Sequence, residues 1–177
     1  MVRDGFLSLK NRGPDRGKLS ITTDYISGFQ RLCINDLSLA GDQPFVSETG
    51  NLLQCNGEIF NYQELSAAHD ITCSSNSDCE VILHLFEKIG ISETVKSLNG
   101  DYAFCLNTKS HVYMVRDISG VRPLFYGKTY LNNLCVASTA KSLLNFSKDV
   151  YEVPPGITCY DKDRKSTRLN SSHTVIS

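Results

Sequence analysis

Residues 52–62 read Leu52-Leu53-Gln54-Cys55-Asn56-Gly57-Glu58-Ile59-Phe60-Asn61-Tyr62, and the rest of the chain is organised around this stretch. A run of apolar residues broken by Asn-Gly predicts a buried strand that ends in a tight turn, because Gly tolerates backbone conformations that a residue with a Cβ resists. The Asn56 amide and the Gly57 N–H can both donate to one oxygen, as an oxyanion hole requires. An ordinary hairpin turn carries the same pair, so the residues alone leave both interpretations open.

An arginine lies in an apolar stretch upstream of this segment. Residues 18–26 and 28–34 predict two strands joined by a turn near Ser27-Gly28, and Arg31 lies in the second strand. One interpretation is an exposed side chain whose stem packs on the sheet edge. The other is a guanidinium that binds a ligand carboxylate through two N–H groups.

Ser77-Asp78 begins the clearest predicted helix. Apolar residues follow at helical spacing, and Gly90 is expected to end the helix. An acidic residue in a first turn ordinarily caps the helix, and Asp78 fits that role. Its carboxylate could instead hold a substrate ammonium group.

The remaining pattern predicts an α+β protein. Short strands separated by turn residues at close intervals indicate a largely antiparallel sheet, and a few helices would pack on it. The predicted strands are 102–107, 111–115, 123–127, 134–138 and 157–160. Short helices are predicted over 61–68 and 140–146, and residues 3–10 are predicted to be the end of a longer helix.

Length and charge restrict the class of protein. The 177 residues fit one domain, and the formal net charge of −1 comes without a long basic run. We therefore expect neither nucleic acid nor a membrane surface as a partner. No apolar run has the length of a membrane span and the N-terminus lacks a signal-peptide core, so a cytoplasmic location is expected.

The seven cysteines are odd in number and scattered along the chain. They form no Cys-x-x-Cys pair, and no His stands at zinc-ligand spacing, so reduced cysteines and no metal site are predicted. Residues 163–177 have few apolar residues and no periodicity. We expect a domain over 1–162 and a disordered or artefactual tail over 163–177.

Several short motifs together resemble the glutamine-hydrolysing domain of asparagine synthetases. The resemblance extends over residues 6–160, and related class II amidotransferases share its Asn-Gly and Ser-Asp elements. The motifs are Asn11-Arg12-Gly13-Pro14-Asp15, Arg31-Leu32-Cys33-Ile34-Asn35-Asp36, Gln43-Pro44, Asn56-Gly57-Glu58-Ile59-Phe60-Asn61, Ser77-Asp78-Cys79-Glu80-Val81-Ile82, Gly100-Asp101-Tyr102-Ala103-Phe104, Arg116-Asp117, Gly120 and Ala137-Ser138.

This resemblance implies an N-terminal nucleophile hydrolase fold, a four-layer αββα sandwich with two antiparallel sheets between helical layers. It also implies glutamine as the substrate. By similarity, Arg31 would hold the α-carboxylate of glutamine and Asp78 its α-ammonium group. The remaining implied contacts are the backbone of Ile34 and Asn35, the oxyanion hole of Asn56 and Gly57, and Glu58 beside it.

The resemblance also implies partners outside this sequence. Glutamine hydrolysis in the family feeds an ATP-dependent ligase reaction that amidates aspartate in asparagine biosynthesis. ATP and Mg²⁺ would belong to a C-terminal synthetase domain, whose Ser-Gly-Gly phosphate loop does not occur in the 177 residues. We therefore expect no cofactor in this chain, with the synthetase domain as a partner and a homodimer as a possible assembly.

The sequence departs from the family at its start. The family nucleophile is an N-terminal Cys activated by its own α-amine, whereas residue 2 here is Val and the opening Cys-Gly-Ile strand is not present. Cys55 lies inside a strand without such an amine, so core packing is its expected role. We expect an inactive product truncated at both ends. The alternatives are a degenerate scaffold domain, as in beta-lactam synthetases, and a regulatory glutamine-binding module.

Overall fold

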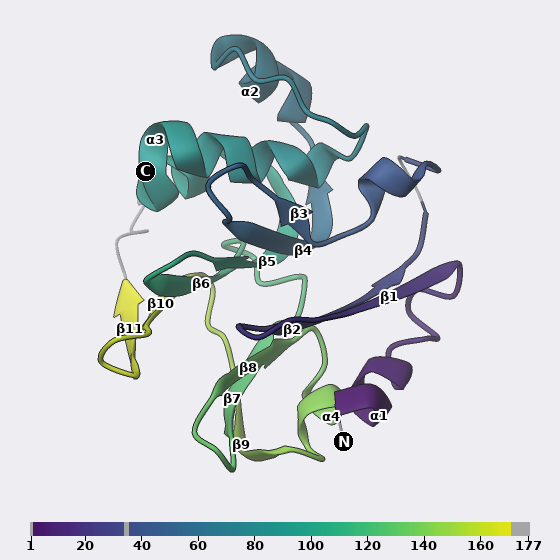
Figure 1. The fold of residues 1–177 in the computed structure, drawn as a ribbon. Coiled ribbons are helices and arrows are strands. Elements are labelled where there is room, and N and C mark those ends of the chain that lie inside the picture. The colour runs from purple at the N-terminus through teal and green to yellow at the C-terminus, as the bar shows by residue number, and fades with distance from the viewer. Residues whose placement is uncertain (1, 34–35, 171–177) are drawn as a thin grey trace.

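The computed structural model describes residues 2–33 and 36–170, which form layers of helices and antiparallel sheets (Figure 1). Two β layers face each other, and helices cover the outer side of each layer. The predicted α+β class is confirmed. Within the described ranges, no helix is both long enough and apolar enough to cross a membrane.

One β layer is a continuous six-stranded sheet in which all neighbouring strands are antiparallel. Its order is β11-β10-β6-β5-β4-β3. The bounds are β3 Phe45–Val46, β4 Leu52–Ile59, β5 Gly100–Asn107, β6 His111–Arg116, β10 Gly156–Asp161 and β11 Ser166–Asn170.

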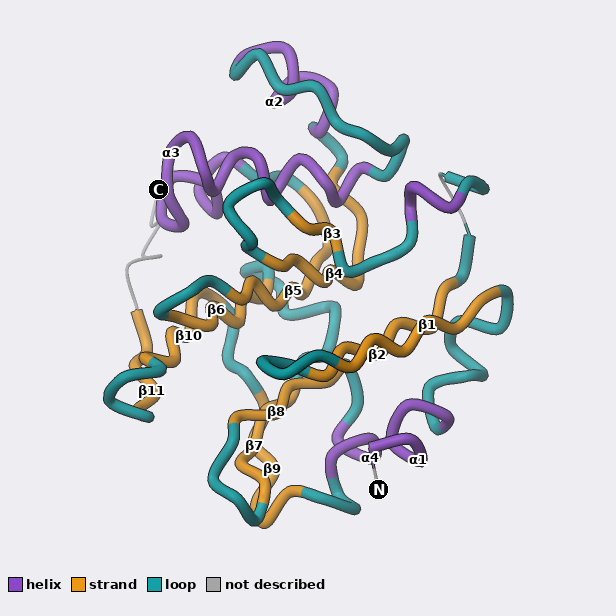
Figure 2. The backbone as a smooth tube through the Cα atoms, viewed as in Figure 1, coloured by secondary structure: helices purple, strands orange, loops and turns teal. Residues whose placement is uncertain are grey.

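The facing layer consists of two separate antiparallel sheets (Figure 2). A two-stranded sheet pairs β1 with β2, and a three-stranded sheet has the order β8-β7-β9. The bounds are β1 Arg16–Ile21, β2 Ile26–Arg31, β7 Phe125–Thr129, β8 Leu134–Ala137 and β9 Ser147–Glu152.

The helices lie on the two outer sides. Helices α2 and α3 cover the six-stranded sheet, and the short helices α1 and α4 lie together beyond the other layer (Figure 1). Their bounds are α1 Val2–Leu7, α2 Tyr62–Ala68, α3 Val81–Ser97 and α4 Ala140–Leu143, with 3₁₀ helices η1 Leu39–Gly41 and η2 Asp78–Glu80.

Two apolar clusters stabilise this arrangement. The larger lies between α3 and the six-stranded sheet and includes the fully buried Leu83 and Phe104. The smaller uses the opposite face of the same strands, with Met114 and Tyr160 meeting Val153 from the other layer. Successive side chains of a strand point to opposite faces, so a central strand contributes to both clusters.

Two predicted boundaries are wrong. The hairpin turn lies at 22–25, where the Thr22 hydroxyl accepts from the Tyr25 N–H at 3.1 Å, and not near Ser27-Gly28. The predicted end of the strand at Asn56-Gly57 is the second, since β4 continues to Ile59. The predicted helix break at Gly90 is confirmed, because Gly90 adopts a non-helical φ of 75° and ψ of 169°, and a second helical segment of α3 follows it to Ser97.

The described part of the expected tail is ordered. Residues 166–170 form β11, which pairs antiparallel with the outer edge of β10. The N–H and C=O groups along a sheet edge can pair with an added strand in this way. The Asp161 carboxylate accepts from the Asp163 and Arg164 N–H groups at 3.0 Å and shapes the turn between the two strands. The predicted disorder is therefore wrong for this part, and residues 171–177 lie outside the described residues.

Candidate functional site

Strand β4 divides its side chains between two environments. Leu53, Cys55 and Ile59 point into the core beneath α3, while Leu52 and Gln54 line the space between the β layers. By the alternation of a strand, Asn56 lies on the same face as Gln54. Its Nδ2 atom is buried and has no acceptor among the described residues. A buried amide donor without an acceptor is uncommon, and it is the property that a ligand-binding donor needs.

Gly57 lies within the strand, opposite Tyr102 of β5. A Cβ built at this position would lie 2.2 Å from the Asp101 carbonyl oxygen, so only glycine allows β4 and β5 this close an approach. The strand does not turn at Asn-Gly because all eight of its residues pair with β5. The hairpin-turn interpretation is therefore excluded.

Strand β3 pairs only with Leu52 and Leu53 of β4. Further along β4, side chains cover the edge that faces away from β5. The Cys55 N–H donates to Gln43 Oε1 at 2.7 Å, and Gln43 Nε2 donates to the Cys55 carbonyl at 3.0 Å. Four residues further along the strand, the Ile59 N–H donates to Asp78 Oδ2 at 2.6 Å. Backbone groups at every second residue of a strand point to the same edge, so the Gly57 N–H points to this edge as well.

Asp78 is buried in η2 and faces β4. Its carboxylate bonds to Ile59, and neither Ser77 nor Glu80 makes a side-chain cap at the start of η2 or α3. The next residue, Cys79, donates its thiol to the Gly57 carbonyl at 3.6 Å. Asp78 is thus placed by a tertiary contact beside the Asn56-Gly57 segment.

Arg31 is buried and points into a loop, not outward. Its Nη1 donates to the Ser38 carbonyl at 2.6 Å and to Asp42 Oδ1 at 2.8 Å, and its Nη2 donates to the Asp36 carbonyl. The Arg16 Nε atom meets the other Asp42 oxygen at 2.8 Å. These three hydrogen bonds of Arg31 use its Nη1 and Nη2 atoms.

Two loops connect the predicted site residues. Asp36 Oδ2 accepts from the Asn76 N–H at 2.9 Å, which joins the loop around Arg31 to the segment before Asp78. Hydrogen bonds from Ser38 and Asn76 hold the pKa of the Asp36 carboxyl below its usual value. The fold thus links Arg31, Asp78 and β4 through short chains of contacts.

Two sets of predicted residues do not join this group. Glu58 is exposed at the end of β4, opposite Asp101, and makes no hydrogen bond to a described side chain. Ile34 and Asn35 lie outside the described residues, so their predicted contacts stay predictions. Cys55 points into the α3 core, away from the face that carries Asn56, as its predicted packing role requires.

Sequence reasoning assigned no role to Gln43 and Asp117, although both belong to the quoted motifs. Gln43 fastens the edge of β4, and Asp117 is buried with one carboxylate oxygen 3.2 Å from the Tyr102 N–H. Burial, and then the Asp117 charge, raise the pKa of Tyr102 well above its usual value. The sequence shows that both are polar residues near strand ends, but it does not show which backbone groups they bind.

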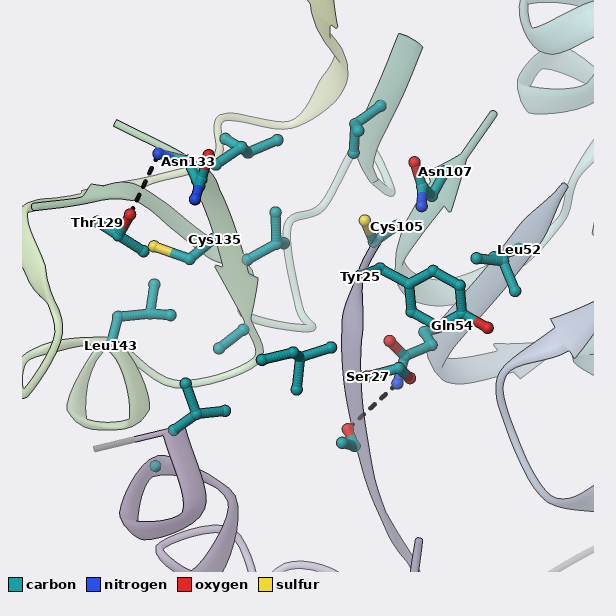
Figure 3. A pocket seen from close by; sticks show the side chains of 18 of the residues that line it. Tyr25, Ser27, Leu52, Gln54, Cys105, Asn107, Thr129, Asn133, Cys135 and Leu143 are labelled. Atoms are coloured by element: carbon teal, nitrogen blue, oxygen red, sulfur yellow. Dashed lines mark hydrogen bonds between the residues drawn. The ribbon is translucent and has the colours of Figure 1, made fainter. Parts of the chain in front are cut away.

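A cavity of about 720 Å³ lies beside this region, between the two β layers (Figure 3). Gln54, Cys105 and Asn107 line it from the six-stranded sheet, Tyr25 lines it from the turn between β1 and β2, and Cys135 lines it from β8. Gln54 Nε2 donates to the Gly28 carbonyl at 3.2 Å across one side. None of the predicted site residues lines this cavity, so the predicted site lies further along the same face of β4.

Comparison with known proteins gives a consistent result. Residues 1–158 match the glutamine amidotransferase domain family. The chain is 38% identical over 154 residues to a probable glutamine-hydrolysing asparagine synthetase of Acanthamoeba polyphaga mimivirus, covering 83% of this chain and 28% of that protein. It is 39% identical over 142 residues to asparagine synthetase 2 of Bacillus subtilis, covering 78% of this chain and 19% of that protein.

Solved structures agree on the fold. Glutamine phosphoribosylpyrophosphate amidotransferase from B. subtilis superimposes with a TM-score of 0.66 at 24% identity, covering 80% of this chain and 33% of that one. The predicted N-terminal nucleophile hydrolase fold is thereby confirmed. The chain spans 19–28% of the length of the asparagine synthetases compared. Because the family match covers most of the 177 residues, this chain belongs to the glutamine amidotransferase domain family.

Proposed function

We propose that this domain binds glutamine, with the side-chain amide oxygen of the ligand held by Asn56 and Gly57. The buried Asn56 Nδ2 atom without an acceptor carries the proposal. The Gly57 N–H points to the neighbouring edge of β4, so one oxygen at this edge can accept from both donors. Two donors to one carbonyl oxygen bind the amide and polarise it toward attack.

The amino-acid end of glutamine requires one anion and one cation. Asp78 supplies a buried carboxylate beside β4, which suits the α-ammonium group. Arg31 supplies the cation for the α-carboxylate. The contacts of its guanidinium to Ser38 and Asp42 fix its position in the loop. The Ile34 and Asn35 backbone would complete the contacts.

Hydrolysis needs a nucleophile in addition to polarisation. Residue 2 is Val, and an alkyl side chain cannot attack an amide carbon. Loss of a nucleophile costs about 10⁶ in kcat in a well-studied hydrolase. We therefore propose that the 177-residue polypeptide binds glutamine without releasing ammonia. In a whole asparagine synthetase, such a domain would supply ammonia for ATP-dependent amidation of aspartate by the synthetase domain.

Calorimetric titration of the purified chain with glutamine tests the proposal. Wild type should bind glutamine more tightly than glutamate, and Asn56→Ala should weaken binding at least tenfold by removing one donor to the amide oxygen. Asn133→Ala is the matched control, because Asn133 is exposed in a distant loop. Absence of binding by wild type, or equal binding by Asn56→Ala, would contradict the proposed site. Release of ammonia above a heat-treated control would contradict the proposed lack of hydrolysis.

A further inference from the structure

Three side chains with metal-ligand atoms meet near the start of α3. Cys73 comes from the loop after α2, Glu80 ends η2, and His84 lies one helical turn later. Their candidate ligand atoms all lie within 4.8 Å of one another. Within the described ranges, this is the one group of three such side chains that the fold assembles.

The spacing of the nitrogen and oxygen atoms fits ligands better than it fits an ordinary hydrogen bond. His84 Nε2 lies 3.4 Å from Glu80 Oε1, which is long for an N–H···O bond. Two ligands about 2.1 Å from a tetrahedral zinc ion lie about 3.4 Å apart. These two side chains are therefore already at ligand spacing, and the partly exposed Cys73 Sγ lies within 4.8 Å of both.

Glu80 is fixed in place by its neighbours. Ser74 donates to its Oε1 through the backbone N–H at 2.9 Å and the hydroxyl at 2.7 Å, and Ser75 donates to its Oε2 at 2.8 and 2.5 Å. Burial alone would raise the pKa of Glu80, but these hydrogen bonds lower it. The carboxylate is therefore ionised. The Ser75 donors at Oε2 would form the outer shell of a metal site, and a zinc ion at Oε1 would take the place of a Ser74 donor.

We propose that Cys73 Sγ, the Glu80 carboxylate and His84 Nε2 bind one zinc ion, with water as the fourth ligand. A thiolate, an imidazole and a carboxylate are the three ligand types that zinc accepts, and calcium or magnesium would avoid the sulfur. The side chain of His84 is 31% exposed, which leaves a path for the ion and the water.

Binding exchanges a proton for the metal. Burial and the Glu80 charge raise the pKa of the Cys73 thiol to about 11, so the metal-free site holds a neutral S–H. The S–H bond breaks, its proton leaves to solvent, and the sulfur electron pair forms the bond to zinc. No oxidation or reduction takes place. The ion would clamp η2 to the preceding loop, and η2 also carries Asp78.

Titration of the chelator-treated 177-residue chain with Co²⁺ tests the site, because cobalt reports a thiolate ligand by an intense near-ultraviolet absorption band. We expect the band to saturate at one equivalent and to disappear when Zn²⁺ displaces Co²⁺. Cys73→Ser should abolish the band. Cys159→Ser is the matched control, a partly exposed cysteine on β10 outside the cluster, and should keep it.

Two further variants distinguish a zinc ligand from a residue of the outer shell. His84→Gln should weaken zinc binding by more than the 10–100-fold expected for Ser75→Ala, which alters only the outer shell. Circular dichroism should show all variants folded, since Cys73 and His84 are not fully buried. The proposal is overturned if wild type binds no zinc, if Cys73→Ser keeps the band, or if His84→Gln binds zinc as wild type does.

Discussion

The two β layers of this domain share an antiparallel design but differ in continuity. The six-stranded sheet is hydrogen bonded from edge to edge and packs its fully buried Phe104 and Leu83 under α3. The facing layer is divided into two sheets, with a cavity of about 720 Å³ beside their edges and with Ile21 70% exposed. Continuous pairing and the larger apolar cluster thus stabilise one side, while the divided side packs on the smaller cluster.

The proposed glutamine site extends across this difference. Asn56, Gly57 and Asp78 belong to the continuous side, and Arg31 ends a strand of the divided side. Local opening free energies within a protein range from near zero to the global value, and they follow buried contacts. We expect the amide-binding half of the site to be more rigid than the half that binds the α-carboxylate.

The largest expected effect is in the core of the continuous side. Phe104→Ala should lower the free energy of unfolding by about 3–5 kcal/mol, because a fully buried aromatic side chain leaves a cavity. Leu131→Ala is the control on the divided side, where an 83% exposed side chain should change stability by less than about 0.5 kcal/mol. Urea denaturation measures both. Equal losses of unfolding free energy in the two variants would contradict the proposed difference between the two layers.

The buried ion pair between Arg31 and Asp42 should come second. Arg31→Ala leaves a buried carboxylate with only the half-exposed Arg16, and we expect a loss of about 3 kcal/mol. The exposed pair of Lys96 and Glu93 is the control, and Lys96→Ala should cost less than about 1 kcal/mol.

Amide hydrogen exchange shows which layer the Arg31→Ala change reaches. Protection of β1 and β2 should fall, because Asp42 and Gln43 connect this hairpin to the edge of β4. Strands β4, β5 and β6 should keep their protection. Uniform loss of protection across both layers would show that the layers open as one unit.

A single hydrogen bond across the layers should have a smaller effect. Gln54→Ala removes the 3.2 Å bond to the Gly28 carbonyl, so we expect a loss of about 1 kcal/mol and faster exchange in β2. The control is Gln63→Ala, since Gln63 is exposed on α2 and its side-chain amide donates to the hydroxyl of the neighbouring Tyr62. Unchanged exchange in β2 would mean that this contact does not hold the hairpin.

The smallest effect concerns acid stability near the start of α3. Burial alone would raise the pKa of Glu80, but hydrogen bonds from Ser75 and Ser74 lower it in the folded state. A lowered folded pKa means that the ionised group stabilises the fold above the unfolded pKa of about 4.3, and that this contribution is lost as the pH falls through the folded pKa.

In the presence of a chelator, Glu80→Gln should therefore lose less stability than wild type as the pH falls below about 4.3. Glu93→Gln, at an exposed position on α3, should follow the wild-type curve. Denaturation at a series of pH values measures the slopes. Parallel curves for Glu80→Gln and wild type would contradict the role of the serine hydrogen bonds.

Local patterns predicted the elements better than they predicted the connections between them. Alternating and apolar runs located most strands, and the apolar stripe after Ser77 located α3, because side-chain periodicity depends only on nearby residues. Strand β9, Ser147–Glu152, was missed because its exposed polar residues lack a hydrophobic period. The stop signal at Gly90 is also local, and helix α3 is interrupted there by a non-helical backbone conformation.

The sequence by itself determined the α+β class, the Asn56-Gly57 pair and the family motifs, because each depends on residue type and short spacing. Only the tertiary structure decided that β4 continues through that pair, since β5 supplies partners for all of its residues. It also decided that Arg31 faces Asp42, and that Cys73 meets Glu80 and His84. Such contacts join loops far apart in the chain, and their positions follow from the packing of whole layers.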